Sequence, residues 1–356
     1  MPYDSSEKKK IVFFSFVGSN YSRSSVILNF ESRRFQKEFF YLPTGVLNFS
    51  KLIFSKRHEI RKADYLVVMS PCHIVTPFLR VLTKRSVILD AGWSLTDGQI
   101  SRGLKTQSRI KSIRIYLLDF IAFHSADRLC LESEIQAFRT SRIFLVPRRK
   151  IKVIFTSLDE TLFHANTLKS KKIKVLHEKI KKRNSGLIVL FRGKVNSESG
   201  IEHILEAAEI LKDKASFILV CGANDVFPAL PANTILLSKL SDLELSEVYQ
   251  ISDVTLGQLS NHPRLRYTIP HKAFEAGFFA KPYITANSAG VRELYGSESV
   301  VLIDEVTGNS LALEILKLKE RRARLQLGTS IHASYQEKAA QKVINSRFEA
   351  FLEELQ

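Results

Sequence analysis

Short apolar runs alternate with amphipathic helical patterns along almost the whole chain. In the first half, the runs predict strands at 11–17, 39–42, 65–70, 86–91, 128–131 and 151–155. The second half repeats the pattern, with strands expected at 187–191, 217–221, 234–237, 254–259, 282–285 and 300–303. Strands that alternate with helices are typical of parallel sheets joined by crossover helices. The sequence therefore predicts an α/β fold with two doubly wound parallel sheets.

A basic, polar segment separates the two halves. Residues 164–185 carry seven lysines and one arginine among few large apolar residues, which is typical of a linker followed by a solvated helix. A membrane or nucleic-acid contact is the alternative for this segment. We expect domains at 1–164 and 165–335 and a C-terminal helix at 336–356. Among the helices, the pattern predicts 73–84, 105–125, 309–326 and 331–355.

Composition narrows the class of protein. A chain of 356 residues with 45% hydrophobic residues can bury two cores. Neither a membrane span nor a secretory signal is expected, because charges interrupt every long apolar run and 11–17 lacks a small-residue cleavage site. The three cysteines lie far apart and the nine histidines form no metal-binding pair. We therefore expect a cytoplasmic protein with no cofactor and no metal site.

The formal net charge of +17 requires an anionic partner. Nucleic acid, anionic lipid headgroups and phosphorylated substrates all meet this condition. Charge alone does not distinguish them.

A glycine-containing turn follows the strand at 187–191. Arg192 and Lys194 lie two positions apart on either side of Gly193, so in an extended chain both side chains point to one face. Backbone amides at such a turn and the following helix N-terminus attract phosphate oxygens. The turn is either a diphosphate clamp or an ordinary connection between a strand and a helix.

A second candidate segment begins near Thr268 and Pro270. His271 and Lys272 stand in the first turn of the expected helix, where a cation suits a phosphate group. Glu275 lies three positions after Lys272 and shares its helix face, so its carboxylate can accept both hydroxyls of a ribose. The alternative is a surface ion pair between the two.

Three segments in this order resemble the family-4 retaining glycosyltransferases: 191–200, 275–284 and 288–293, within a matching region of 186–303. The resemblance implies the GT-B fold, in which two Rossmann-like domains face a cleft. It also implies transfer of a sugar from a nucleotide-sugar donor to a hydroxyl acceptor, with retention and without metal. The helix at Pro270 to Glu275 is similar to that of bacterial transferases acting in surface-polysaccharide or glycolipid synthesis.

The resemblance assigns roles residue by residue. Lys194 takes the place of the family arginine on the donor phosphates, and Glu275 that of the ribose-binding glutamate. With Arg192 they form the expected catalytic set. Two positions depart from the family, because Ser199 replaces a lysine and Tyr267 replaces a glutamate. Arg192 or Lys272 is expected to replace the missing lysine, and the expected donor-binding residues are Gly18, Ser19, Gly193, His271, Lys272, Ser288, Gly290 and Glu293.

On the acceptor side, the resemblance points to the loop after the first strand, which contains Asn20. Asp90 lies at the C-terminal end of the expected strand 86–91, and Trp93 follows that strand, at the edge where open α/β sheets bind ligands. Many relatives have histidine at the position of Asp90, so a base role does not transfer. Trp93 either stacks on a sugar or packs in the core.

Segment 102–123 mixes five cationic residues with a dense apolar set. It is either a core helix with a solvated basic end or a membrane-surface patch that presents a lipid-linked acceptor, supported by a second such stretch at 33–61. The second alternative would place the cytoplasmic transferase at the inner face of the membrane, with an anionic lipid surface as a partner. The rival is a non-catalytic nucleotide- or nucleic-acid-binding protein of the same fold, which predicts aromatic residues interleaved with cations.

Overall fold

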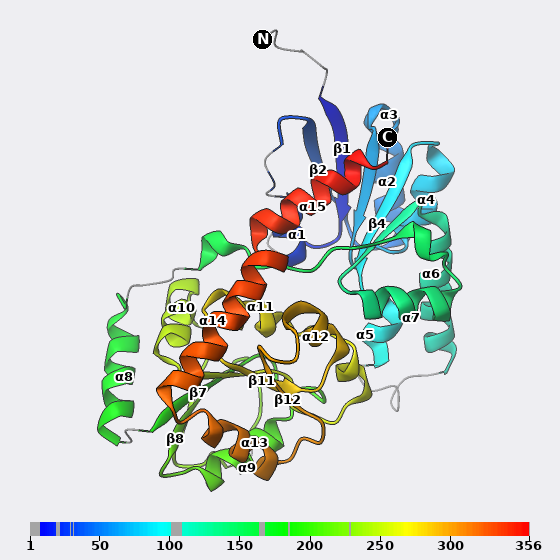
Figure 1. The fold of residues 1–356 in the computed structure, drawn as a ribbon. Coiled ribbons are helices and arrows are strands. Elements are labelled where there is room, and N and C mark those ends of the chain that lie inside the picture. The colour runs from blue at the N-terminus through cyan, green and yellow to red at the C-terminus, as the bar shows by residue number, and fades with distance from the viewer. Residues whose placement is uncertain are drawn as a thin grey trace. The chain divides into compact units, whose positions relative to one another are not determined.

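The computed structural model describes residues 8–18, 22–28, 30, 32–100, 109–163, 168–183, 186–227 and 229–355. The predicted site residues Ser19 and Asn20 lie outside this part, as do Arg102 and Lys105 of the basic-apolar segment. Contacts divide the chain into two units, Met1–Thr156 with Lys342–Gln356 and Ser157–Gln341. Each unit contains one six-stranded sheet, and Figure 1 shows the elements, with labels where there is room.

The first unit is built on a parallel sheet in the order β2-β1-β3-β4-β5-β6. Its central strands β1, β3 and β4 are mostly buried, as expected where helices cover both faces of a parallel sheet. The strands are β1 (Lys9–Ser15), β2 (Phe35–Tyr41), β3 (Tyr65–Met69), β4 (Ser86–Gly92), β5 (Arg128–Leu131) and β6 (Ile151–Val153). All six overlap a predicted strand, although β2 begins four residues before the expected 39–42.

Helices from both ends of the chain complete the first unit. They are α1 (Ser22–Leu28), α2 (Val46–Ser55), α3 (Arg57–Lys62), α4 (Val75–Leu82), α5 (Leu95–Ile100), α6 (Arg109–Ser125), α7 (Glu134–Phe144), the 3-10 turn η2 (Arg148–Lys150) and α15 (Gln341–Glu353). The ring of Phe348 in α15 lies 6.4 Å from that of Phe13 in β1 and 5.9 Å from that of Phe30. This apolar contact attaches the C-terminal helix to the first unit.

The second unit has a parallel sheet in the order β12-β11-β10-β7-β8-β9. Its strands are β7 (Leu187–Arg192), β8 (Ala215–Val220), β9 (Thr234–Leu237), β10 (Val254–Leu256), β11 (Tyr283–Ala286) and β12 (Val301–Ile303). Its helices are η3 (Glu160–Leu162), α8 (Lys171–Arg183), α9 (Ile201–Ile210), α10 (Asp242–Ile251), η4 (Pro263–Arg266), α11 (His271–Phe278), α12 (Ala289–Tyr295), α13 (Gly308–Lys317) and α14 (Arg321–Lys338).

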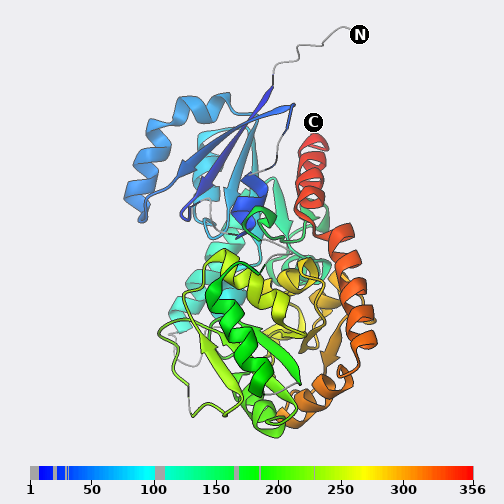
Figure 2. The same cartoon turned by 90° about the vertical axis from the view of Figure 1, so that its left-hand side faces the viewer.

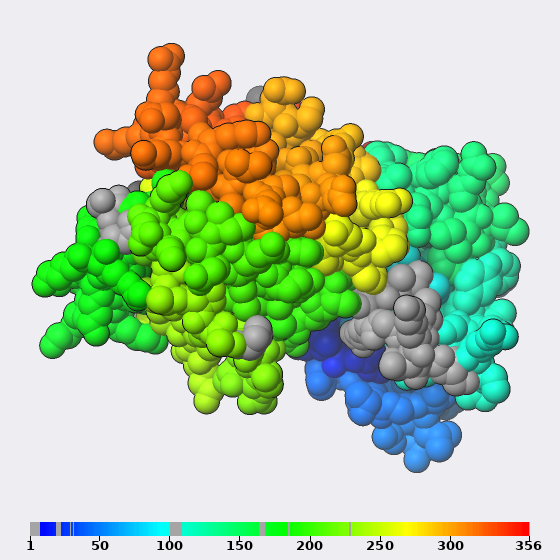
Figure 3. Space-filling view, turned by 90° about the horizontal axis from the view of Figure 1, so that it is seen from below, coloured from blue at the N-terminus to red at the C-terminus, as the bar shows by residue number. Residues whose placement is uncertain are grey.

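Alternate residues of β7 pack into two separate hydrophobic cores, one on each face of the sheet. Val189 and Phe191 pack with α9 and α13 on one face of the sheet, and these two helices lie side by side in Figure 3. Ile188 and Leu190 pack with α8 and α10 on the other face, and Figure 2 shows these two helices in front of the sheet. Because side chains alternate across a strand, one apolar run serves both layers. The predicted pair of doubly wound parallel sheets is confirmed.

The division between the units differs from the expected boundaries at 164/165 and 335/336. Ser157 and Glu160 already belong to the second unit, because Ser157 Oγ donates to the Ala339 carbonyl at 2.5 Å and Tyr335 donates to Glu160 at 2.7 Å. The expected separate helix at 336–356 is divided between α14 and α15, and α15 packs on the first unit.

The predicted helix bounds 309–326 and 331–355 were wrong. The structure has three helices here, with breaks near 318–320 and 339–340 rather than at 327–330. The sequence around Gly328 resembles a helix end, but Gly328 lies within α14. A Cβ at this position would lie 2.3 Å from the carbonyl oxygen of Ala280. The glycine therefore permits close packing of a continuous helix.

Candidate functional site

The strand order of the second unit defines a binding edge. The chain runs from β7 to β8 on one side and later returns to β10 on the other side of β7. In open α/β sheets, ligands bind outside the carboxyl ends of the strands at such a reversal. Arg192 ends β7, and Gly257 and Gln258 follow β10. The predicted clamp residues therefore lie at the edge where the fold favours a ligand.

Glu275 of α11 lies beneath the surface at this edge and accepts hydrogen bonds from three side chains. Its side chain is fully buried, and its Oε1 accepts hydrogen bonds from Arg192 Nη1 at 2.7 Å and from His271 Nδ1 at 3.3 Å. Tyr249 of α10 donates its hydroxyl to Oε2. Burial by itself would raise the pKa of Glu275, but the charge of Arg192 and the bonds from His271 and Tyr249 lower it to about 2. Glu275 is thus an anion that fixes Arg192.

Arg192 connects this buried carboxylate to the surface. Its side chain remains 37% exposed while Nη1 is held by Glu275. The charge of Glu275 raises the pKa of the guanidinium. Part of the guanidinium is therefore available to an external anion.

Lys272 places a second cation beside the same turn. Its Nζ lies 4.0 Å from the centre of the Phe191 ring and 3.3 Å from Gln258 Oε1. Burial lowers its pKa to about 7, although Glu275 partly opposes this shift. Within the described part of the chain Lys272 has no ion pair at bonding distance. An incoming anion would therefore stabilise its charged form.

Gly193 and Gly200 shape the turn after β7. A Cβ on Gly193 would lie 2.9 Å from Lys272 Nζ, so a side chain there would displace the ammonium group. Gly200 caps α9 with φ of 65° and approaches the backbone of Leu259 so closely that a Cβ would lie 1.9 Å from its carbonyl oxygen. Between them, Lys194 is exposed and Ser199 is buried. The structure places Arg192 and Lys272 beside one glycine turn, and Lys194 follows Gly193 with an exposed side chain.

Other predicted donor-binding residues support the segment that leads into α11. Ser288 caps α12 and donates to the Thr268 carbonyl at 2.6 Å. Gly290 lies against the same segment, because a Cβ on it would approach Ile269 to 2.9 Å. Tyr267 is buried, and Glu293 is half-buried on α12. These contacts fix the start of α11 and so the position of Lys272.

In the first unit, the predicted acceptor-side residues Asp90 and Trp93 differ in solvent exposure. Asp90 is fully buried, and both of its oxygens accept hydrogen bonds from the Arg23 guanidinium at 2.6–3.0 Å. An acceptor contact by Asp90 would therefore compete with Arg23. Trp93 is half-buried, and Gly18 is exposed.

Sequence reasoning missed Tyr249, Gln258 and Arg23. Tyr249 belongs to the apolar pattern of α10, and its contact with Glu275 joins residues 26 positions apart. Arg23 is 67 positions from Asp90. No local motif predicts either pairing, because each joins residues that are far apart in the sequence and meet only in the folded chain.

In the described ranges, no helix combines the length and apolar character needed to cross a membrane.

Comparisons with known proteins show a family match in sequence and similar folds among solved structures. Residues 172–341, which make up most of the second unit, match the family model described as "Glycosyl transferases group 1". No curated protein sequence matches the chain.

Solved structures with similar folds span nearly the whole chain. Anabaena HepE in complex with UDP-glucose has a TM-score of 0.73 at 14% identity, with 97% of this chain and 99% of that chain covered. A glycosyltransferase from Rickettsia africae has a TM-score of 0.73 at 12% identity, covering 98% and 99%. WaaG, a glycosyltransferase involved in lipopolysaccharide biosynthesis, has a TM-score of 0.59 at 12% identity, covering 96% and 98%. The two units thus have the Rossmann-like folds of GT-B proteins, and the family match supports a glycosyltransferase.

Proposed function

We propose that this protein transfers a sugar from a nucleotide-sugar donor to a hydroxyl acceptor, and that its second unit binds the donor. The observation that carries the proposal is the position of Arg192 and Lys272 beside Gly193 at the switch point of the second sheet, with the exposed Lys194 next in the chain. The family match covers all three residues. UDP-glucose in a protein of similar fold supports the donor class.

The chemistry of this transfer suits the three cations. As the bond between the sugar and the diphosphate breaks, the departing diphosphate gains negative charge. Preorganised cations that face this charge stabilise the transition state more than the bound donor. Arg192 is held in place by Glu275, and Lys272 by Phe191 and Gln258. We therefore propose that these side chains assist departure of the nucleotide without a metal ion.

The resemblance gives Glu275 a second role, as acceptor for the ribose hydroxyls. Both carboxylate oxygens already accept hydrogen bonds. Oε1 accepts two of these bonds and Oε2 one, which leaves one of about four acceptor positions free. Binding of both ribose hydroxyls by Glu275 therefore requires one of them to replace a present donor. Retention of the anomeric configuration also rests on the resemblance, and NMR of the product's anomeric proton tests it.

We also propose that the first unit docks on an anionic membrane through α6, where a lipid-linked acceptor would be presented. Ile110, Ile113, Leu117 and Ile121 repeat at helical spacing and are 47–62% exposed, while Phe123 faces the core. Arg109, Lys111 and Arg114 are exposed along the same helix. An apolar stripe beside cations complements a surface of anionic lipids. Surface-polysaccharide or glycolipid synthesis at the inner face of the membrane is the setting that we propose.

The proposed activity is tested by incubating the protein with uridine, guanosine and adenosine diphosphate sugars and an extract of bacterial lipids as acceptor. We expect one base to be preferred, release of free nucleoside diphosphate, and no loss of turnover with a metal chelator. If no donor releases diphosphate, and single-stranded nucleic acid rather than a nucleotide raises the melting temperature, the rival binding function is the better explanation.

A further inference from the structure

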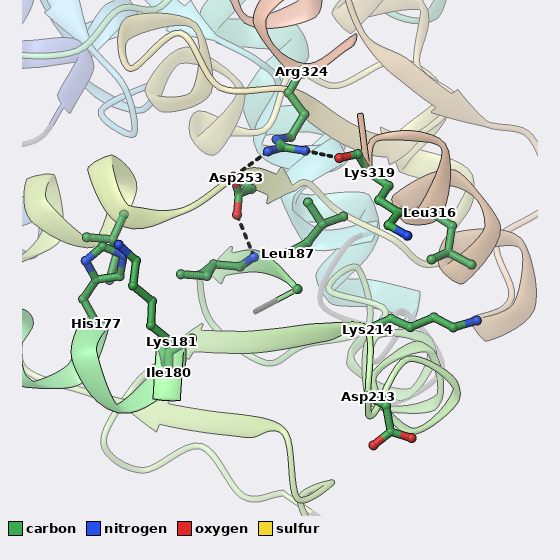
Figure 4. Close-up of a pocket in the computed structure, with 13 residues that line it drawn as sticks. His177, Ile180, Lys181, Leu187, Asp213, Lys214, Asp253, Leu316, Lys319 and Arg324 are labelled. Atoms are coloured by element: carbon green, nitrogen blue, oxygen red, sulfur yellow. Dashed lines mark hydrogen bonds and ion pairs between the residues drawn. The ribbon is translucent and has the colours of Figure 1, made fainter. Parts of the chain in front are cut away.

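A cavity lies at the edge of the second sheet opposite to Arg192. It has a volume of about 670 Å³ and lies at the amino ends of β7, β8 and β10 (Figure 4). Its apolar lining comes from Ile180, Leu187, Ile188, Ile251 and Leu316. This volume is in the range of sites for small organic ligands, which is roughly 300–1,000 Å³. The cavity is too large for a single inorganic ion and has an apolar surface for an organic body.

One charged pair in the cavity is already neutralised. Arg324 Nη2 lies 3.2 Å from Asp253 Oδ1, and Arg324 Nη1 donates to the carbonyls of Leu318 and Lys319 at 2.8 and 2.6 Å. Asp253 Oδ2 accepts a hydrogen bond from the Ile188 amide at 2.9 Å. These contacts join α14 to the ends of α13 and β7. Arg324 and Asp253 are therefore held by each other and by the backbone, and the lysines of the lining are the cations that can bind a ligand.

The remaining cations come from three different elements. Lys181 belongs to α8, Lys214 immediately precedes β8, and Lys319 follows α13. All three are exposed, and none has an ion pair among the residues that the structure describes. Asp213 is the one other carboxylate in the lining. The rim is therefore positively charged.

Figure 4 shows how these cations are distributed. Lys181 lies beside His177 on one side of Asp253, and Lys214 and Lys319 lie on the other side. Burial and the charge of Lys181 lower the pKa of His177, so the ring favours its neutral form. A ligand that contacts both groups of lysines needs two separated anionic groups.

We infer that this cavity binds a soluble metabolite with two separated phosphate groups, of the sugar-bisphosphate class. Lysine ammonium groups bind phosphate as point charges, and the apolar floor accommodates the organic body. A nucleic acid would need aromatic side chains for base stacking, and the lining contains no aromatic residue other than His177. The site lies at the other edge of the sheet from the proposed donor site, so occupation of one does not block the other.

Calorimetric titration of the full chain with fructose 1,6-bisphosphate tests this inference. One triple variant removes the lining cations, Lys181→Ser, Lys214→Ser and Lys319→Ser. A matched triple variant removes neighbouring exposed cations that do not line the cavity, Lys182→Ser, Lys212→Ser and Lys317→Ser. Both variants lose the same charge from the same three regions, so general electrostatics affects them equally.

We expect the wild-type protein and the matched variant to bind the bisphosphate with a Kd below roughly 1 mM and the lining variant to bind at least about ten-fold more weakly. Inorganic phosphate should bind more weakly than the bisphosphate. Equal weakening in both variants, or no binding by the wild-type protein, would overturn the inference. So would a lining variant that loses binding to phosphatidylglycerol vesicles but keeps the bisphosphate, because the ligand would then be a lipid headgroup.

Discussion

Glu275 carries the buried negative charge on which the proposed donor site depends. Its two oxygens connect Arg192, His271 and Tyr249, which come from three elements of the second unit. The sequence singles out Glu275 and Arg192, because both belong to recognisable motifs. It does not identify Tyr249, which carries no motif and is indistinguishable from an ordinary core residue of α10.

Tyr249→Phe is expected to reduce stability by about 1–3 kcal/mol, since Oε2 of a buried carboxylate loses its hydrogen-bond donor. The ring contacts with Phe279 remain, because only the hydroxyl is removed. Urea denaturation measures the change. Tyr41→Phe is the matched control, since Tyr41 is 59% exposed. Equal stability of both variants would remove Tyr249 from the network.

The lowered pKa of Glu275 predicts how stability depends on pH. A carboxylate with a folded-state pKa of about 2, against an ordinary value of 4.5, contributes stability that is fully present above pH 4.5 and is lost as pH falls toward 2. The stability difference between the wild-type protein and Glu275→Gln should therefore shrink by roughly 3 kcal/mol over this interval. Denaturation curves at several pH values measure it. A difference that stays constant with pH would contradict a paired, ionised Glu275.

At the scale of elements, the strands were predictable and several helix ends were not. Apolar runs mark β3, β4 and β7 because these strands are buried on both faces. Within α14, Gly328 packs closely against the carbonyl of Ala280, a tertiary contact that local sequence does not reveal. Glycine is a poor helix former, so its local preference predicts a helix end at Gly328, where the structure has a continuous helix.

Gly328→Ala is therefore expected to destabilise the protein by about 1–3 kcal/mol, because the new methyl group overlaps the Ala280 carbonyl. At an exposed helix position the same exchange would stabilise by up to about 1 kcal/mol. Ala333→Gly, at an exposed position of the same helix, serves as the reference for helix propensity. Thermal melting of both variants measures the effect. A stabilised Gly328→Ala protein would show that α14 does not pack this closely.

Helix α6 is the element that tests membrane docking. Replacing Ile113 and Leu117 by Ser should reduce sedimentation with phosphatidylglycerol vesicles by about ten-fold or more, since apolar contact and charge act together. Salt should release the wild-type protein. Leu313→Ser with Leu325→Ser, at exposed positions of the second unit, is the matched control. Equal loss in both variants, or equal binding to neutral vesicles, would contradict docking through α6.

At the scale of the whole molecule, the repeated pattern of strands predicted two parallel sheets, and the structure confirms both. The assignment of α15 to the first unit was not predictable, since its amphipathic sequence does not specify the core that it covers. Contacts such as Phe348 with Phe13 join opposite ends of the chain. Local patterns identify helices and strands. Which unit α15 packs on depends instead on the apolar surface that the folded units present.

The most direct test of a nucleotide-sugar function is calorimetric titration with uridine, guanosine and adenosine diphosphates. One of the three should bind with a Kd in the micromolar range, and Lys194→Ala and Lys272→Met should each weaken it by about ten-fold, or ~1.4 kcal/mol. Lys212→Ala, an exposed lysine outside the site, should leave it unchanged. Absence of binding to all three diphosphates, or binding that is unaffected in folded Lys194→Ala and Lys272→Met proteins, would contradict a donor site at the Gly193 turn.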